Sequence, residues 1–195
     1  METKESIIVE SRNFFGTFGY EATSMSMIAE AVAIKKPSLY SHYKSKEDIF
    51  KDVLDKEMQD YIAHLKSVLN DNQKRVMEIL HDLMKTMSLD STGDASADFY
   101  YRYARYQPQE LKDYIMERYT ESENTARVLF DDIIERGKRE GEIDAELSNA
   151  QIYSTYFLLL DGLAVTPDFY GKTYQEGEFD RVWEVFQRGI RPASV

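Results

Sequence analysis

Cysteine is absent from this chain of 195 residues, and its absence excludes disulfides, thiolate metal sites and cysteine nucleophiles. Histidine occurs only three times, as His42, His64 and His81. The sequence also lacks a glycine-rich phosphate loop and a recognisable Ser/His/Asp arrangement. We therefore expect no metal, no cofactor and no catalytic residue, and a small all-α enzyme is kept only as an alternative.

Long hydrophobic runs are missing as well. The longest, Tyr156 to Leu160, is far shorter than the roughly 20 apolar residues that span a bilayer. Residues 1–15 carry charges throughout and have no apolar stretch of the kind found in signal peptides. Because 43% of the residues are hydrophobic, a folded core is expected. These features predict a soluble cytoplasmic protein without a membrane partner.

Positive charge is scarce, with 24 Lys and Arg against 35 Asp and Glu. Residues 1–50 carry six basic and seven acidic side chains, whereas residues 51–195 carry 18 and 28. Such an acidic body repels a polyanion, so any contact with nucleic acid must be confined to a local patch. One stretch fits that requirement, because residues 31–46 contain four lysines, two tyrosines and a histidine but no acid.

Helical periodicity runs through almost the whole chain, and no alternating strand pattern, internal repeat or low-complexity tract is present. We predict an all-α fold. A first helix should end at Gly19, a second should be capped by Thr23, and Pro37 should lie in the first turn of a third. Ser45 and Asp48 resemble a capping box that opens a long fourth helix.

The fourth helix is expected to reach Leu69, before a turn at residues 70–72. Pro108 and Pro167 are expected to interrupt or stop later helices. The later helices are predicted over residues 76–87, 98–106, from about 109 to 137, 149–165 and 179–190, with loops over residues 88–97 and 168–178.

Two short helices joined by a three- to four-residue turn and followed by basic residues form a helix-turn-helix pattern. An ordinary surface hairpin with solvated lysines is the alternative interpretation. The stretch 37–43 favours nucleic-acid binding, because Leu39 is almost its only apolar residue and its aromatic side chains have polar tips suited to phosphate. The start of the next helix, at Lys46, offers free backbone N–H groups to an anion.

These residues resemble the DNA-binding domain of the TetR/AcrR family of one-component bacterial regulators. The matching segments are "FGYEATSM", "IAEA" and "SLYSHYKSKED", in the family's order and spacing over roughly residues 7–54. Ala33 is a departure, because the family usually has glycine at this turn position, where glycine relieves backbone strain. The resemblance implies an Ω-shaped homodimer, with a helix-turn-helix DNA-binding domain at residues 1–48 and a ligand-binding and dimerisation domain at residues 49–195.

The resemblance also assigns the DNA-binding residues. Side chains at the start of the third helix should meet base edges, those around its end should hold phosphates, and two from the second helix should touch the DNA backbone. The base-edge residues are Lys35, Lys36, Pro37 and Ser38, the phosphate residues are Tyr40, His42, Tyr43 and Lys46, and the backbone residues are Thr23 and Ser24.

Tyrosine clusters at residues 99–106 and recurs along the following helices. One interpretation is packing in the core and at an interface; the other, suggested by the resemblance, is an aromatic-walled ligand pocket. The candidate ligand residues are Phe99, Tyr103, Tyr106, Tyr114, Tyr153, Tyr156, Phe157 and Asp161. A carboxylate such as Asp161 on an apolar helix face needs a partner, which leaves open a structural role or a contact with ligand.

The last two predicted helices are apolar on more than one side and so need two partners, and in the family they form the four-helix bundle of the dimer. The expected interface residues are Leu159, Leu163, Trp183, Phe186 and Ile190. The resemblance thus implies a repressor that binds a palindromic operator in double-stranded DNA and is released by a small amphipathic effector. Given the acidic body, a neutral or cationic effector is expected. An activator, or an acidic adaptor that no longer reads DNA, is the alternative.

Overall fold

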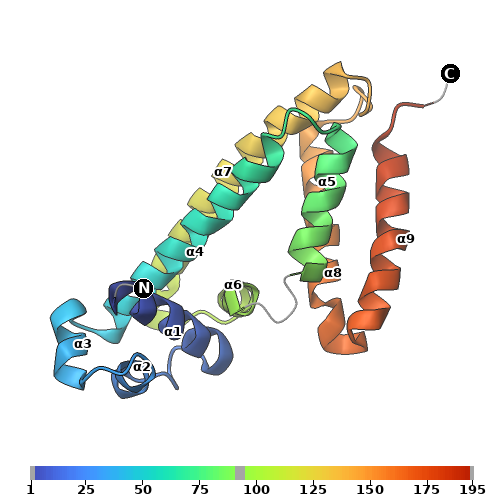
Figure 1. Ribbon diagram of the computed structural model, residues 1–195. Coiled ribbons are helices and arrows are strands. Elements are labelled where there is room, and N and C mark those ends of the chain that lie inside the picture. Colours follow the sequence, from blue (N-terminus) through green and yellow to red (C-terminus); the bar gives the residue numbers. More distant parts are fainter. Residues whose placement is uncertain (1–2, 91–94, 194–195) are drawn as a thin grey trace. The chain divides into compact units, whose positions relative to one another are not determined.

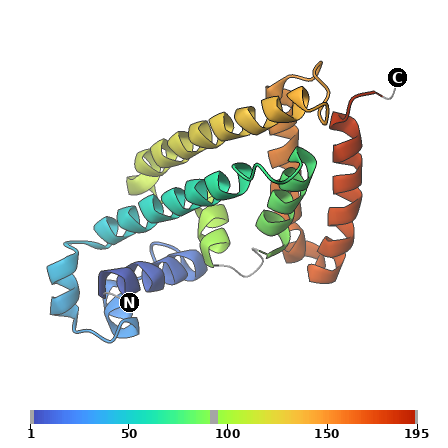
Figure 2. The ribbon, with the colours of Figure 1, turned by 45° about the horizontal axis from the view of Figure 1, so that its top comes forward.

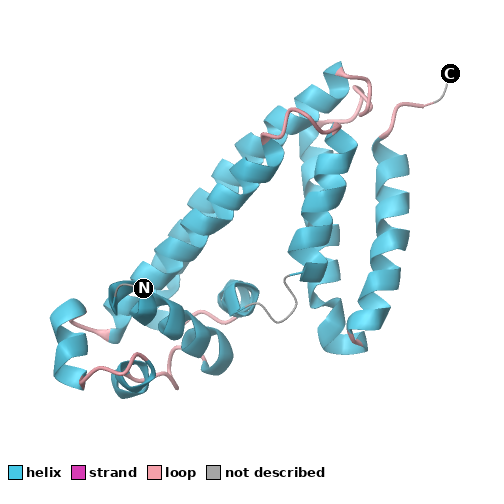
Figure 3. Cartoon of the chain, in the orientation of Figure 1, coloured by secondary structure: helices cyan, strands magenta, loops and turns pink. Residues whose placement is uncertain are grey.

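The computed structural model describes residues 3–90 and 95–193, and within these ranges every regular element is a helix (Figures 1 and 3). The predicted all-α fold is confirmed. The described residues form two compact units, each built from two stretches of the chain. Among the described helices, none combines the length and the apolar composition needed to cross a bilayer.

The first unit comprises residues 1–61 and 93–122. Its aromatic core joins both stretches, since the Phe50 ring lies 5.3 Å from that of Phe15 and 4.8 Å from that of Tyr103. The helices of this unit are α1 (Thr3–Phe18), α2 (Met25–Ala31), α3 (Lys36–His42), the first part of α4 (Lys46–Leu69), α6 (Ala95–Arg105), the short 3₁₀-helix η2 (Gln109–Leu111) and the first part of α7 (Lys112–Arg139).

The second unit comprises residues 62–92 and 123–195. In it α8 packs lengthwise against α9 (Figures 1 and 2), and the core gathers around Phe130, Tyr156 and Phe186. Besides the ends of α4 and α7, its helices are α5 (Val76–Lys85), the π-helix η1 (Thr86–Asp90), α8 (Asn149–Tyr170) and α9 (Lys172–Ile190).

Several predicted helix boundaries are confirmed, and three are wrong. Ser24 caps α2 in place of Thr23, and its hydroxyl accepts from the Met27 N–H at 3.3 Å. The predicted loop at residues 88–97 is partly helical, because η1 extends to residue 90 and α6 begins at residue 95, while residues 91–94 lie outside the described ranges.

The third error lies at the end of α8, where residues 168–178 were expected to be a loop. The helix continues through Pro167 to Tyr170. The proline removes one backbone N–H donor from the helix, but the Gly171 N–H still closes the last turn on the Pro167 carbonyl at 3.0 Å. The chain then turns at Gly171, whose φ of 85° lies in the region that favours glycine, and α9 begins at the next residue. The division predicted between residues 48 and 49 separates two functions, whereas the two units are defined by their packing. That division stays a prediction.

Candidate nucleic-acid interface

The turn between α2 and α3 sets the direction of the third helix. The Ile34 N–H donates to the Ala29 carbonyl at 2.9 Å, and the Ala33 N–H donates to the Glu30 carbonyl at 3.0 Å. This pair of bonds is a Schellman motif, in which the residue after the helix cap takes a left-handed conformation. Ala33 holds that position with φ 55°, so the chain adopts the turn despite lacking the usual glycine.

Within helix α3 one side chain is buried and the others are exposed. Leu39 is fully buried, and Pro37 lies in the first turn as predicted. The Tyr43 N–H closes the helix on the Leu39 carbonyl at 3.0 Å. The side chains that remain exposed on or beside α3 are Lys35, Lys36, Pro37, Ser38, Tyr40, Ser41, His42 and Lys44. This surface carries lysine, hydroxyl and aromatic groups and no carboxylate.

Tyr43 ties the end of α3 to α4. It is 5% exposed, and its hydroxyl donates to the Asp52 carboxylate at 3.0 Å. Lys4 of α1 pairs with the same carboxylate at 2.9 Å. Burial, together with the hydrogen bond to Asp52, raises the pKa of the Tyr43 hydroxyl above its ordinary value. In the protein without DNA, therefore, Tyr43 fixes α3 on the fourth helix.

Thr23 and Lys46 also make contacts inside the protein. Thr23 is 1% exposed, and its hydroxyl donates to the Gly19 carbonyl at 2.8 Å. The Lys46 ammonium donates to the Tyr20 carbonyl at 2.6 Å and lies 4.1 Å from the centre of the Tyr20 ring. Both side chains thus secure the turn between α1 and α2, and their roles toward DNA stay predictions. Ser24 is exposed beside them.

The residues predicted to line one ligand pocket are divided between the two units. Phe99, Tyr103 and Tyr114 belong to the first unit, where the Tyr103 hydroxyl donates to the Phe15 carbonyl at 3.1 Å and Tyr114 donates to Asp55 at 2.7 Å. Tyr106 is in the same unit but is 73% exposed.

The remaining predicted ligand residues belong to the second unit. Tyr153, Tyr156 and Phe157 gather around Phe130, and the Tyr156 hydroxyl donates to the Leu80 carbonyl at 2.7 Å. These rings fill a core. Asp161, in contrast, is exposed on α8.

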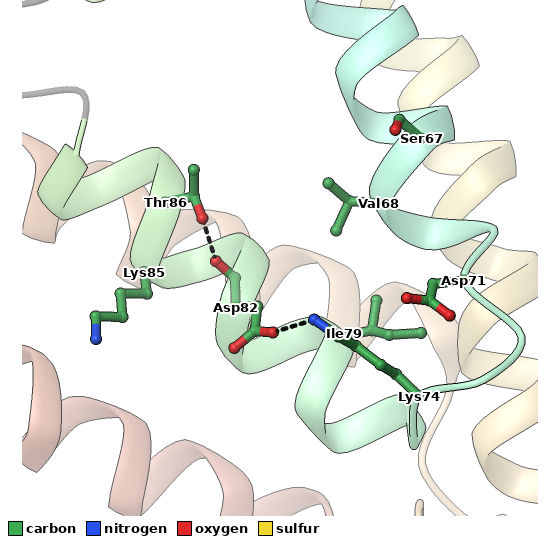
Figure 4. A pocket seen from close by; sticks show the side chains of 8 residues that line it. All are labelled: Ser67, Val68, Asp71, Lys74, Ile79, Asp82, Lys85 and Thr86. Carbon is green, nitrogen blue, oxygen red and sulfur yellow. Dashed lines mark hydrogen bonds and ion pairs between the residues drawn. The ribbon is translucent and has the colours of Figure 1, made fainter.

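A cavity of about 380 Å³ lies in the second unit beside α5 and the end of α4 (Figure 4). The Lys74 ammonium donates to the Asp82 carboxylate at 2.7 Å, which raises the pKa of the lysine and lowers that of the aspartate. Lys85 extends away from this pair. The lining residues are Ser67, Val68, Asp71, Lys74, Ile79, Asp82, Lys85 and Thr86, none of which the sequence pattern singled out.

Most of the predicted dimer residues are buried within the protomer. Leu163, Trp183, Phe186 and Ile190 are 3 to 8% exposed, and Leu159 is half-buried. Other apolar residues of the same helices face solvent, since Leu158 of α8 and Val185 of α9 are each 73% exposed.

Comparisons with known proteins agree with this geometry. Residues 7–53 match the family described as bacterial regulatory proteins, tetR family. The HTH-type transcriptional repressor ComR of Escherichia coli K12 is 32% identical over 79 residues, covering 40% of this chain and 38% of ComR. The HTH-type transcriptional activator FasR of Mycolicibacterium smegmatis is 25% identical over 95 residues, covering 47% of this chain and 43% of FasR.

The chain therefore spans about two-fifths of the length of these curated relatives. The similarity in fold to solved structures covers much more of the chain than the similarity in sequence does. The transcriptional regulator FadR from Bacillus subtilis, solved in complex with stearoyl-CoA, matches with a TM-score of 0.73 over 96% of this chain and 99% of its own, at 21% identity. The matching family and the curated relatives are regulators that bind DNA and not enzymes.

Proposed function

We propose that the chain is a transcriptional repressor of the TetR family of bacterial regulators, the family that residues 7–53 match. In this proposal a homodimer binds a palindromic operator through α3 of each protomer, and a small amphipathic ligand releases it. Residues 1–48 carry the DNA contacts, and the rest of the chain carries the ligand and dimer contacts.

The observation that supports DNA binding best is the exposed surface of α3. Within α3 only Leu39 is buried, while Lys35, Lys36 and Tyr40 project into solvent. Exposed lysines at the start of a recognition helix are suited to guanine O6 and N7 in the major groove. The rest of the chain is strongly acidic, so DNA is attracted to this surface and repelled elsewhere.

The test is a fluorescence anisotropy titration against the DNA upstream of the protein's own gene, at several salt concentrations. We expect tight binding that weakens steeply with salt and that Lys36→Ala reduces. Lys66→Ala, which removes an exposed lysine from the second-unit part of α4, is the matched control and should bind like the parent protein. Binding of equal strength to unrelated DNA would argue for an adaptor that no longer reads sequence.

The homodimer is supported by an apolar face on α8 and α9 that the protomer leaves exposed. Leu158 and Val185 lie on it, and Gly162 and Gly189 have no atoms near the position of a Cβ, which leaves room for a close helix approach. We expect Leu158→Glu to convert the dimer into monomers in sedimentation velocity runs. Val128→Glu, at a 61% exposed position on α7, is the control and should remain dimeric.

The ligand class is supported by two observations that point in different directions. Residues 51–195 are acidic and so favour a neutral or cationic amphiphile. FadR, which shares the fold, was solved with stearoyl-CoA, which is an anionic amphiphile. A thermal-shift comparison of stearoyl-CoA, a neutral long-chain alcohol and a quaternary-ammonium amphiphile distinguishes these classes. Stabilisation by stearoyl-CoA alone would overturn the preference for neutral or cationic ligands.

The sign of regulation is the last part of the proposal. ComR is named a repressor and FasR an activator, so the relatives include both. We favour repression because a ligand-released repressor needs only to lose its DNA binding, whereas an activator also needs a surface that contacts the transcription machinery. A reporter fused to the upstream DNA should rise when the gene is deleted. A fall would identify an activator.

A further inference from the structure

The C-terminal end of α1 lacks partners of its own. The last turn contains no basic side chain, and the carbonyls of a final helical turn have no donors within the helix. Gly19, with φ 87°, ends the helix, and its N–H satisfies only the Phe15 carbonyl, at 3.1 Å. The carbonyls of Gly16 and Thr17 therefore need donors from elsewhere.

Helix α6 supplies them. Arg102 donates from Nε to the Gly16 carbonyl at 2.6 Å and from Nη2 to the Thr17 carbonyl at 2.9 Å. The neighbouring Tyr103 hydroxyl donates to the Phe15 carbonyl at 3.1 Å. A guanidinium at a helix C-terminus also interacts favourably with the partial negative charge there. Three consecutive carbonyls of α1 thus accept hydrogen bonds from two adjacent residues of α6.

The two helices are also in close contact at this point. A Cβ added to Gly16 would lie 3.2 Å from the backbone nitrogen of Phe99 and 3.4 Å from the Ala95 carbonyl oxygen. A Cβ added to Gly19 would lie 3.3 Å from Nη1 of Arg102. The missing side chain of Gly16 therefore makes room for α6, and that of Gly19 makes room for the Arg102 guanidinium.

The segment that Arg102 holds leads directly into the DNA-reading helices. After Gly19 the chain turns toward α2, and this turn is fixed by the Thr23 hydroxyl on the Gly19 carbonyl and by Lys46 on the Tyr20 carbonyl. Arg102 binds the carbonyls of Gly16 and Thr17, which lie just before this turn. The direction in which the chain enters α2 therefore depends on contacts from α4 and α6 as well as on the turn itself.

We propose that Arg102 is a positioning residue for DNA binding: from α6 it caps α1 and so sets the placement of α2 and α3. This inference rests on the proposed DNA binding. Arg102 lies outside residues 7–53, the part of the chain that matches the family's DNA-binding domain. The DNA-reading surface is therefore completed by a helix that lies more than 40 residues beyond that segment.

The test compares Arg102→Gln and Arg102→Lys with Arg105→Gln in the full chain. Arg105 is exposed on the same helix, so its substitution removes the same charge without removing the cap. The DNA is the duplex that the parent protein selects from a random pool. Arg102→Gln should lower affinity by about tenfold or more, because only a fraction of molecules would hold the binding-competent arrangement. Arg102→Lys should lose less, and Arg105→Gln should bind like the parent protein.

Amide hydrogen exchange without DNA gives a second measurement. In Arg102→Gln, exchange should become faster at residues 16–23 and stay unchanged in α8 and α9, whereas general destabilisation would accelerate exchange in both units. Equal affinities for Arg102→Gln and Arg105→Gln, or unchanged exchange at residues 16–23, would overturn the inference. If Arg102→Gln does not fold, the test relies on Arg102→Lys, and an unchanged DNA affinity in that variant would overturn the inference. If the parent protein selects no duplex, the proposed DNA binding fails, while exchange at residues 16–23 still decides whether Arg102 positions the turn.

Discussion

The substitution Ala33→Gly should stabilise the protein, although it removes a side chain. Ala33 is exposed and has φ 55°, in the left-handed region where a Cβ crowds the following carbonyl. That crowding costs about 1–2 kcal/mol for an L-residue. Glycine relieves it but adds freedom to the unfolded chain, which costs about 0.4–1 kcal/mol. The expected net gain in the free energy of unfolding is on the order of 0.5–1 kcal/mol.

Urea denaturation followed by circular dichroism measures this gain. The midpoint should rise while the slope stays constant, because the surface exposed on unfolding hardly changes. Ala31→Gly is the matched control, two residues earlier in the last turn of α2, where φ is negative and glycine should cost up to about 1 kcal/mol. If both substitutions destabilise the protein equally, the left-handed conformation at Ala33 is not a source of strain, and the reasoning from φ is refuted.

Three further predictions concern DNA, alkaline pH and helix α5. Lys36→Ala should cost about 1–3 kcal/mol of binding free energy and relax the preference at one base pair per half-site, whereas Lys46→Ala should weaken binding to all sequences alike and make it less dependent on salt. Affinities for operator variants at several salt concentrations distinguish the two effects, and the reverse pattern would contradict the placement of α3. Burial raises the pKa of Tyr20 and of Tyr153 to about 12. Because the unfolded pKa is about 10, this stabilisation is complete below pH 10 and is lost as the pH rises toward 12; urea midpoints from pH 8 to 11.5 should fall above pH 10, and a constant midpoint would count against it. Glu142→Ala should cost about 2–3 kcal/mol by removing the carboxylate that accepts from the Val76 and Met77 N–H groups at 3.2 and 3.1 Å, while Glu146→Ala, at an exposed residue, should have little effect on thermal unfolding.

Local signals in the sequence were sufficient to predict most of the N-terminal helices. Gly19, Pro37 and the Ser45–Asp48 pair act within a few residues of themselves, so their positions in the sequence predicted where helices begin and end. Thr23 and Ser24 show the limit of that approach, because either hydroxyl can cap a helix. The Thr23 hydroxyl donates to the Gly19 carbonyl, which leaves Ser24 as the cap.

Nonlocal contacts could not be predicted in the same way. The tyrosines at residues 99–106 suggested a single aromatic wall, but Tyr103 bonds a carbonyl 88 residues away and Tyr106 faces solvent. Sequence spacing shows that such residues share a helix and does not show what lies opposite each one. The same reason hid Arg102, whose partners are two backbone carbonyls and therefore leave no residue-type pattern.

Helix α8 shows most clearly what periodicity cannot decide. It is apolar on two sides, so its sequence indicates two partners without saying which side meets the core of its own protomer. The structure places Leu163 inside and Leu158 outside, and on α9 it places Trp183 inside and Val185 outside. Glycine at the exposed positions 162 and 189 was the available signal, because small residues allow two helices to approach closely. A charge at Trp183 therefore tests the stability of the protomer, and a charge at Leu158 tests the dimer alone.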